Sequence, residues 1–474
     1  MSAKTKTLWT FAITSIALFM VTLDNLVVTT AIPVIRTDLG ASLESLEWTV
    51  NAYTLTFAVL LLTGAALGDR FGRRRVFAIG IGVFTLGSIA AALAPSVEAL
   101  NIARAVQGLG GAIVMPLTLT ILSAAVPASK RGLALGAWGG ISGLAVAFGP
   151  LVGGAVVEGL SWQWIFWLNV PIGVLLIPLV LTRLTESHGP AGRLDFPGLG
   201  LASAGLFGIV WALIRGNAEG WTSLEIAGSL GLGLVLVAAF VAWELRAPSP
   251  MLPMRFFRSA TFALANLSSL FMFFGMFGSI FLLSQFFQTV QGYSPFGSGL
   301  RILPWTLAPM FIAPLAGAMS DKIPGRTLIG IGLSLQASAL AWISLVSSPT
   351  VSYSQLIVPF MLAGIGMALF FAPAANIVLS AVRPEEEGQA SGANNAIREL
   401  GGVFGVAVLA SVFASRGGYE SAQAFSDGMN PALLIGAVVV GLGAVAAFAI
   451  PGRRARAAEA EAEPTVAEPL LQAA

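Results

Sequence analysis

The chain has 474 residues, of which 56% are hydrophobic and 10% are charged, and its mean hydropathy is +0.85. A soluble domain has about 25% charged residues, so this composition is that of an integral membrane protein. The 25 basic and 23 acidic residues leave a net charge of only +2, with no basic patch among aromatic residues, which argues against a nucleic-acid partner. The absence of cysteine excludes disulfides, thiolate-ligated zinc and thiol catalysis.

Fourteen apolar segments follow one another along the chain, separated by short polar loops. Each is near or above the length of about 20 residues that a membrane-spanning helix needs. The first is longer than the apolar core of a signal peptide and has no cleavage pattern after it, so we expect it to be retained. The segments lie at residues 9–31, 48–68, 76–95, 100–126, 132–157, 163–182, 197–214, 225–243, 260–287, 297–319, 327–347, 355–379, 390–414 and 430–450. The predicted fold is an all-α membrane protein with fourteen transmembrane helices.

Basic residues concentrate in alternate loops, which is the pattern of cytoplasmic loops in membrane proteins. If the N-terminus is cytoplasmic, the opposite side holds only Arg36, Arg215, Arg301 and Arg416, and the other loop arginines lie inside. The sequence therefore predicts a multi-pass protein with both termini in the cytoplasm.

Asp24 is an acid inside the first apolar segment, where a charge costs about 2.5 to 3.5 kcal/mol. Arg104 is predicted at a similar depth in the fourth segment. Asp24 lies about 18 Å before Arg36, at the outer end of the first helix, and Arg104 lies about 8 Å into a helix that begins on the outer side, so both fall in the outer half of the membrane. The two could pair directly or through Gln107 and a water. A conformational change that alters the pair would load or empty a proton site, and the alternative is a static pair that orients two helices.

Glu399 is a second candidate for proton coupling, in the thirteenth segment. Its neighbour Arg398 projects about a quarter-turn away, so the two cannot neutralise each other face to face. Glu399 could hold a proton or recognise a cation, and the alternative is an interhelical partner. The acids at segment ends, Glu158, Glu244 and Glu385 to Glu387, are expected to be solvated, and the lone histidine, His188, is given no role.

Two similar loops indicate an internal repeat. Asp69 to Arg73 follow the second segment, and Asp321 to Arg326 follow the tenth. If the seventh and eighth segments are an insertion, each loop follows the second helix of a six-helix half, as in transporters built from parallel repeats. We expect an N-terminal half at 1–183, a two-helix insertion with linkers at 184–258, a C-terminal half at 259–451 and a disordered tail at 452–474.

Two further patterns suggest moving parts. Asp69, Arg70, Gly72 and Arg73 form a tight charged turn, which we interpret as a latch of salt bridges that closes the inner gate. The fifth segment is rich in glycine and contains Gly149, Pro150, Gly153 and Gly154. The glycines let helix backbones approach closely, and the proline bends the helix. We interpret this part of the helix as a pliant seam between the halves, and the alternative is tight packing alone.

Aromatic and polar residues in several segments are candidates for lining a broad apolar cavity. The predicted lining is Asn25, Gln107, Trp138, Phe148, Phe274, Phe277, Phe371, Asn376, Asn394 and Arg398.

Several of these motifs resemble the major facilitator superfamily, and specifically its fourteen-helix drug:proton antiporter branch. The loop Gly68 to Arg74 is similar to the gating motif of the superfamily, and Arg104 to Gly108 to its arginine motif. Gly149 to Gly154 resemble the antiporter motif, and Asp24 with Pro33 the acidic motif of the first helix. Trp162 to Phe166 with Asn169, and Asn394 with Arg398, Gly401 and Gly402, are similar to motifs of the sixth and penultimate helices.

The sequence departs from these motifs at five places. Leu26 and Thr29 stand where a hydroxyl residue and an asparagine are usual, and Ala65 stands where the gating motif usually begins with glycine. Gln163 replaces an arginine, and Glu399 replaces a glutamine.

The resemblance implies a proton-coupled antiporter in a bacterial cell membrane, which exports hydrophobic or amphipathic small molecules, cationic ones included, by alternating access. Its partners would be the substrate, protons and the lipid bilayer, with no cofactor beyond the proton gradient, and it would work as a monomer. The nearest alternative is an exporter dedicated to one antibiotic or metabolite. A passive channel would need charged rings, and an enzyme a metal cluster, a phosphate loop or a Ser/His/Asp set, and none of these patterns occurs.

Overall fold

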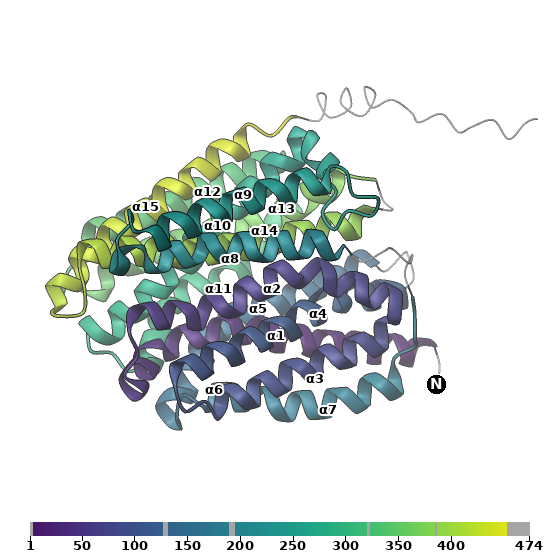
Figure 1. Ribbon diagram of the computed structural model, residues 1–474, viewed down its shortest axis with the longest axis horizontal. Helices are drawn as coiled ribbons and strands as arrows, with labels where there is room; N and C mark the ends of the chain where they lie inside the picture. The colour runs from purple at the N-terminus through teal and green to yellow at the C-terminus, as the bar shows by residue number, and fades with distance from the viewer. Residues whose placement is uncertain (1–2, 127–130, 189–194, 320–322, 384–385, 453–474) are drawn as a thin grey trace, which may run out of the picture.

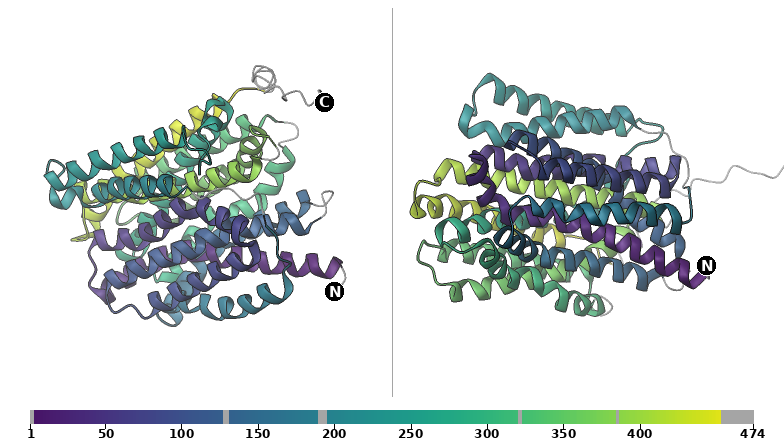
Figure 2. Two further views of the ribbon diagram at one scale, coloured as in Figure 1. Left: turned by 45° about the vertical axis from the view of Figure 1, so that its right-hand side comes forward. Right: turned by 90° about the horizontal axis from the view of Figure 1, so that it is seen from below.

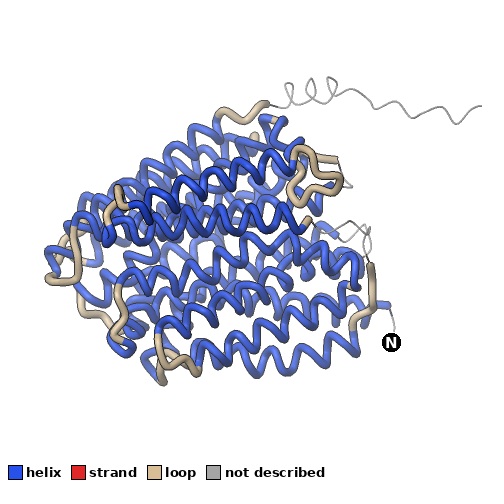
Figure 3. The backbone as a smooth tube through the Cα atoms, in the orientation of Figure 1, coloured by secondary structure: helices blue, strands red, loops and turns tan. Residues whose placement is uncertain are grey.

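The computed structural model describes residues 3–126, 131–188, 195–319, 323–383 and 386–452. The described residues form fifteen α-helices and no strand (Figures 1 and 3). The helices are α1 (Ala3–Leu39), α2 (Leu43–Phe71), α3 (Arg73–Ala92), α4 (Val97–Ala125), α5 (Arg131–Gly159), α6 (Trp164–Trp167), α7 (Asn169–Arg183), α8 (Phe196–Glu219), α9 (Leu224–Glu244), α10 (Ala260–Gln285), α11 (Pro295–Met319), α12 (Gly325–Val346), α13 (Tyr353–Ser380), α14 (Glu387–Arg416) and α15 (Ala422–Phe448).

Eleven of the described helical spans are long and apolar enough to cross a membrane, and a bent pair within α2 would make a twelfth. The short α6 and the following α7 count as one span, Trp164–Arg183, because only Leu168 separates them. The structure thus confirms an all-helical membrane protein, and the number fourteen stays a prediction.

The long helices run back and forth along one common direction (Figure 1). We call the end of the bundle that holds Thr5 the proximal end and the end that holds Leu39 the distal end. Polar caps mark several helix starts, where side chains of Ser42, Ser96 and Ser223 accept hydrogen bonds from backbone N–H groups. The last described residues also lie at the proximal end, where Arg326 donates a hydrogen bond to the carbonyl of Ile450 at 3.1 Å. Which end faces the cytoplasm stays a prediction.

The helices pack in two groups, α1 to α7 and α10 to α15 (Figure 2). The groups meet mainly where α5 packs against α11 and α2 against α14. Helix α9 packs chiefly against α8, and α8 in turn contacts both α2 and α14. A small apolar core joins these three helices and includes Leu55 of α2, Val210 of α8 and Val403 of α14. The expected division at residues 1–183, 184–258 and 259–451 stays a prediction, and residues 453–474 of the tail lie outside the described residues.

Some expectations about helix ends were wrong. The first apolar segment continues as a helix to Leu39, because four further apolar residues, at 32–35, and then Arg36 to Leu39 extend the same helix. The ninth segment ends in a π-helix, Phe286–Val290. Glu244 was expected to be solvated, but it is only 3% exposed, because the linker after α9 folds back over it. Glu158 is exposed as expected, and Glu385 and the side chain of Glu387 lie outside the described residues.

Candidate functional site

Asp24 and Arg104 form an ion pair inside the N-terminal group of helices, 2.5 Å from Asp24 Oδ2 to Arg104 Nη1. Both side chains are 1% exposed. α1 carries the acid near its middle and α4 carries the arginine near its start, and the two helices pack against each other. The structure thus brings together the two charges that were predicted to pair because they lie at similar depths.

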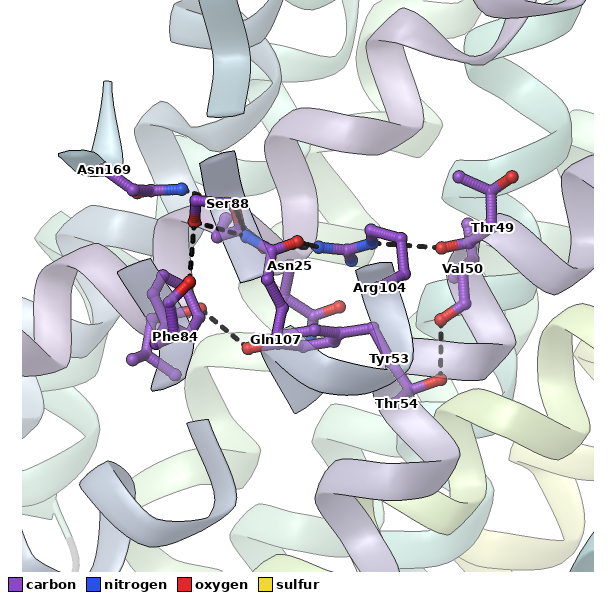
Figure 4. Close-up of polar contacts among 12 residues, drawn as sticks. Asn25, Thr49, Val50, Tyr53, Thr54, Phe84, Ser88, Arg104, Gln107 and Asn169 are labelled. Carbon is purple, nitrogen blue, oxygen red and sulfur yellow. Dashed lines mark hydrogen bonds and ion pairs between the residues drawn. The ribbon is translucent and has the colours of Figure 1, made fainter. Parts of the chain in front are cut away.

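Two amides complete the surroundings of the Asp24 carboxylate (Figure 4). Asn169 Nδ2 donates to Asp24 Oδ1 at 2.7 Å, and Gln107 Nε2 donates to the same oxygen at 3.2 Å. Gln107 also accepts a hydrogen bond from Arg104 at 2.8 Å and donates to Ser88 Oγ at 2.7 Å. Asp24 is therefore held by one cation and two amide donors from two other helices, α4 and α7.

Arg104 is fixed on its other sides by α2. Its Nε donates to the carbonyl of Thr49 at 3.1 Å, and its guanidinium lies 4.2 Å from the ring centre of Tyr53. Tyr53 in turn donates its hydroxyl to the carbonyl of Val21 on α1 at 3.3 Å. A guanidinium over an aromatic face gains cation–π energy when water is excluded, so this arginine is stabilised by a ring as well as by a carboxylate.

Glu399 lies in a different environment, on α14 of the C-terminal group. Among the described residues its carboxylate has one hydrogen-bond partner, Asn25 Nδ2 at 3.5 Å, and no ion pair. Asn25 follows Asp24 directly on α1, so one residue of this helix is the first intramembrane acid and the next residue contacts the second. This weak bond links the two groups of helices near the middle of both α1 and α14.

Arg398 does not pair with Glu399 in the structure. Its Nη1 donates to Asn395 at 3.3 Å, and its guanidinium lies over Phe273 at 4.3 Å and over Phe371 at 5.2 Å. The two rings belong to α10 and α13, so the arginine spans three helices. The expectation that neighbouring charges on one helix point apart agrees with this arrangement.

The other predicted cavity residues are scattered. Trp138 donates to Thr118 at 3.1 Å, Phe148 is half-buried and Asn376 is exposed. Asn394 donates to Asn266 at 2.9 Å and to Ser269 at 3.1 Å, so its amide is occupied within the C-terminal group.

Phe274 and Phe277 are only 8% and 5% exposed and belong to the large apolar core. Phe371 packs edge to face against Phe273. A cavity lining built from these residues stays a prediction.

The charged turn between α2 and α3 is held together locally. Arg73 Nε pairs with Asp69 Oδ1 at 2.8 Å, while Arg70 lies beside the ring of Phe71. Gly72 has φ +101°, which L side chains rarely adopt. The carboxylate of Glu186, from the linker after α7, accepts from the Arg74 N–H at 2.9 Å and covers Gly72. The function of this turn as a latch stays a prediction.

The glycines of α5 lie where helices touch. A Cβ on Gly149 would be 2.6 Å from Leu26, and one on Gly153 would be 2.3 Å from Thr30, both on α1. A Cβ on Gly154 would lie 2.4 Å from the carbonyl oxygen of Pro295, at the start of α11.

The contact between α5 and α11 is close in both directions. A Cβ on Gly299 of α11 would lie 2.4 Å from the carbonyl oxygen of Pro150. This part of α5 therefore contacts the N-terminal group through α1 and the C-terminal group through α11.

Further contacts join the two groups at the distal end. Gln288 Nε2 donates to the carbonyl of Thr30 at 2.9 Å, and the guanidinium of Arg36 lies 3.4 Å from the ring centre of Tyr419. Burial raises the pKa of Tyr419, and its neutral hydroxyl donates to Gln285. In this structure the two groups are in contact at the distal end.

Several residues of the site could not be selected from the sequence. Ser88, Thr49 and Tyr53 are single polar residues in apolar segments, where such residues are common. Glu186 lies in a polar linker, and only its neighbours in space give it a role. Asn169 carried a signal, because it belongs to a recognised motif. In the described part of the chain no group of three or more acidic or histidine side chains is placed to hold a metal ion.

Comparisons with known proteins agree with this architecture. The sequence profile of the Major Facilitator Superfamily matches residues 14–406 and 305–473. The multidrug resistance protein Stp of Mycobacterium tuberculosis (strain CDC 1551 / Oshkosh) is 38% identical over 410 residues, which cover 86% of this chain and 76% of that protein. The tetracenomycin C resistance and export protein of Streptomyces glaucescens is 34% identical, over 85% of this chain and 75% of that protein.

A third relative and two solved structures extend the match. The puromycin resistance protein pur8 of Streptomyces alboniger is 33% identical over 93% of this chain and 88% of that protein. A bacterial homologue of the human lysosomal transporter Spinster, in an inward-facing and unoccupied conformation, superposes with a TM-score of 0.66 at 18% identity, over 94% of this chain and 96% of that one. A POT family transporter in complex with 5-aminolevulinic acid gives 0.68 at 16% identity, over 93% of this chain and 94% of that one. The solved structures show the shared fold, and the family profile with the sequence relatives shows that the chain belongs to the Major Facilitator Superfamily.

Proposed function

We propose that the chain is a proton-coupled antiporter, which exports hydrophobic or amphipathic small molecules, cationic ones included, by alternating access of two six-helix halves. One observation carries the proposal. Consecutive residues of α1 serve the two halves, because Asp24 pairs with Arg104 inside one half and Asn25 donates to Glu399 in the other. A movement of the halves therefore changes the surroundings of Glu399 directly.

The two acids have different roles in this proposal. The carboxylate of Asp24 is compensated by Arg104, Asn169 and Gln107. Among the described residues Glu399 has one weak donor and no ion pair, so a proton would remove a charge that is costly at that depth. Glu399 exchanges the proton, while the Asp24–Arg104 pair holds α1, and with it Asn25, in register.

The cycle follows from these roles. When the halves separate on the outer side, Glu399 loses Asn25 and takes a proton from outside. When they close there, Asn25 again donates to the carboxylate, and the proton leaves toward the cytoplasm. When the substrate is neutral, each proton that crosses 100 mV of membrane potential supplies about 2.3 kcal/mol for its outward movement. When one monovalent cation leaves for each proton that enters, no net charge crosses and the pH difference alone drives the exchange.

The names of the relatives support the class of substrate. Relatives are described as a multidrug resistance protein and as resistance or export proteins for tetracenomycin C and puromycin. A cationic substrate would compete with the proton for Glu399, and the rings of Phe273 and Phe371 would favour a planar, apolar guest. Competition for one carboxylate is a simple way to obtain exchange.

The test is transport into proteoliposomes with an imposed pH gradient. Ethidium is the cationic probe, and an internal pH dye reports proton movement. The wild type should move ethidium uphill with opposite proton flux, and Glu399→Gln should lose the gradient-driven component. Glu420→Gln, in an exposed loop, is the matched control. Uphill transport that is unchanged in Glu399→Gln would contradict the role of Glu399.

The same transport assay separates two of the alternatives. A passive channel would give no uphill movement, and an enzyme would alter the probe chemically. A growth-protection assay with a broad antibiotic panel separates the third, because an exporter dedicated to one compound would protect cells against a single member of the panel, whereas a multidrug exporter would protect against several.

A further inference from the structure

Asp195 and Glu244 meet at the proximal end of the hairpin formed by α8 and α9, where side-chain oxygens of both border Gly198. Asp195 is the N-cap of α8, and Glu244 is the last residue of α9. Because the two helices are antiparallel neighbours, the start of one lies beside the end of the other. Glu244 is buried, and neither acid belongs to the transport site described above.

Each carboxyl group has one oxygen with donors. Asp195 Oδ1 accepts from the N–H of Gly198 at 2.9 Å and from Trp243 Nε1 at 2.7 Å. Glu244 Oε2 accepts from the N–H of Leu252 at 2.9 Å. These bonds join both helices and the linker after α9 at a single point.

The other two oxygens face each other without a donor. Asp195 Oδ2 and Glu244 Oε1 are both buried and have no hydrogen-bond partner. They lie 2.5 and 2.7 Å from the position that a Cβ on Gly198 would take, so both border the space of one methyl group. A buried acceptor without a donor has lost its hydrogen bonds to water without replacement, and two neighbouring carboxylates also repel each other.

A single proton removes both costs. When one of the two oxygens is protonated, it becomes a donor to the other, and the pair carries one negative charge in place of two. We propose that Asp195 and Glu244 form a proton-binding site, in which one proton held between Asp195 Oδ2 and Glu244 Oε1 keeps the base of the α8–α9 hairpin closed.

The surrounding charges do not supply another solution. Among the described residues, Arg246 on the next turn is exposed and pairs with neither acid. On α2, Asp69 pairs with Arg73, and before α14, Glu386 pairs with Arg255. None of these groups contacts the two facing oxygens.

The hairpin can pass a change at its base to both halves. Helix α8 packs against α2, where Trp48 contacts Phe207 and Trp211. It also packs against α14, where Asn217 donates to Ser411 Oγ at 3.0 Å. Loss of the proton as the pH rises places two negative charges together, and their repulsion separates Asp195 from Glu244 and loosens the base.

The test uses a reporter cysteine, because the natural chain has none. The reporter is Ser249→Cys, in the half-buried linker, and the rate of its labelling with a maleimide is measured. This rate is divided by the labelling rate of His188→Cys, an exposed site, because the thiol of that cysteine has the same dependence on pH. From mildly acidic to mildly alkaline buffer the ratio of the two labelling rates should rise about tenfold. This is the change expected when the closed base binds the proton about tenfold more tightly than the open base does.

Two variants are matched to the proposal. In Glu244→Gln the amide can donate to Asp195 Oδ2 while its oxygen accepts from Leu252, so the labelling ratio should stay low at every pH. Asp195→Asn retains a good N-cap for α8 and should also remove the pH dependence. Either variant that keeps the full pH response overturns the proposal.

Two outcomes in the wild-type chain also overturn it. One is a labelling ratio that does not change with pH. The other is a ratio that follows the concentration of sodium, potassium or magnesium at constant pH, which would identify a cation between the acids. If both variants fail to fold, the wild type must still show the infrared band of a protonated carboxyl group, and the band must disappear over the pH range in which labelling rises. Absence of that band overturns the proposal.

Discussion

Asn25 of α1 donates a hydrogen bond to Glu399 of α14 across 3.5 Å, and this bond joins two groups of helices that otherwise meet mainly through apolar and backbone contacts. At that length the bond is near the limit for a hydrogen bond, so it stabilises the contact weakly. A weak polar bond between halves that move is easily broken and reformed, as a coupling contact requires.

Asn25→Ala should shift the pH dependence of export. The amide donates to the charged form of Glu399, and its removal disfavours that form. We expect the pH of half-maximal ethidium export to rise, by up to about one unit. Gln389→Ala, which removes an exposed amide on the same α14, is the control. An unchanged pH profile in Asn25→Ala would mean that the bond does not affect the proton.

Asp24→Asn should destabilise the protein through Arg104, which would lose the carboxylate that pairs with it. Removing one partner of a buried ion pair costs about 3 to 5 kcal/mol, whereas replacing both partners costs less. The double variant Asp24→Asn with Arg104→Gln should therefore be more stable in thermal unfolding than Asp24→Asn alone. If the double variant is the less stable of the two, the pair is not the main source of the loss.

The Asp24–Arg104 pair could be predicted from the sequence because charges inside apolar segments are rare and costly. Two such charges at similar depths on helices of one half have few other partners. The fold class followed from hydropathy for the same reason, since water and lipid impose a strong pattern on every helix. The resemblance added which helices are neighbours.

Other relationships depend on the placement of elements that sequence patterns leave open. Asn25 and Glu399 are 374 residues apart, and their contact depends on how the halves are docked. Glu244 was misjudged because a residue at the end of an apolar segment is usually solvated, and the fold of the linker over it leaves no local signal. Glu186 was missed because the turn that it covers lies far away in the chain.

Gly72→Ala should destabilise the turn between α2 and α3. An L residue at φ +101° costs about 1 to 3 kcal/mol, and the new methyl would also meet the carboxylate of Glu186 at 2.9 Å. The double variant with Glu186→Ala separates the two effects, because it removes the contact and leaves the backbone strain. Thermal unfolding should rank the double variant below Glu186→Ala alone.

The control for this prediction is Gly82→Ala in α3, where the nearest atom outside the helix is 3.9 Å from the new Cβ. Alanine should be neutral or stabilising there by about 0.4 to 1 kcal/mol. Equal losses at Gly72 and Gly82 would show that neither the turn conformation nor Glu186 matters.

Gly154→Ala should separate α5 from α11 at the distal end. The new Cβ would lie 2.4 Å from the carbonyl oxygen of Pro295, and since that atom belongs to the backbone, the helices themselves must move. Overpacking of this kind costs about 1 to 3 kcal/mol, and about 1 kcal/mol shifts a two-state equilibrium about fivefold. The backbone N–H of Phe296 donates to Glu158 Oε2 at 3.2 Å, so these two positions lie close together across the contact. With Glu158→Cys and Phe296→Cys in one chain, the yield of a short bismaleimide cross-link would report the shift.

The yield should fall about fivefold in Gly154→Ala, and uphill export should fall with it, because the distally closed state becomes rarer. The control is Gly159→Ala, five residues later on α5, where a Cβ would meet nothing within 4 Å. Its cross-linking yield should equal that of the parent. If both variants cross-link alike, the close approach of Gly154 to α11 does not limit closure, and α5 serves as packing rather than as a moving seam between the halves.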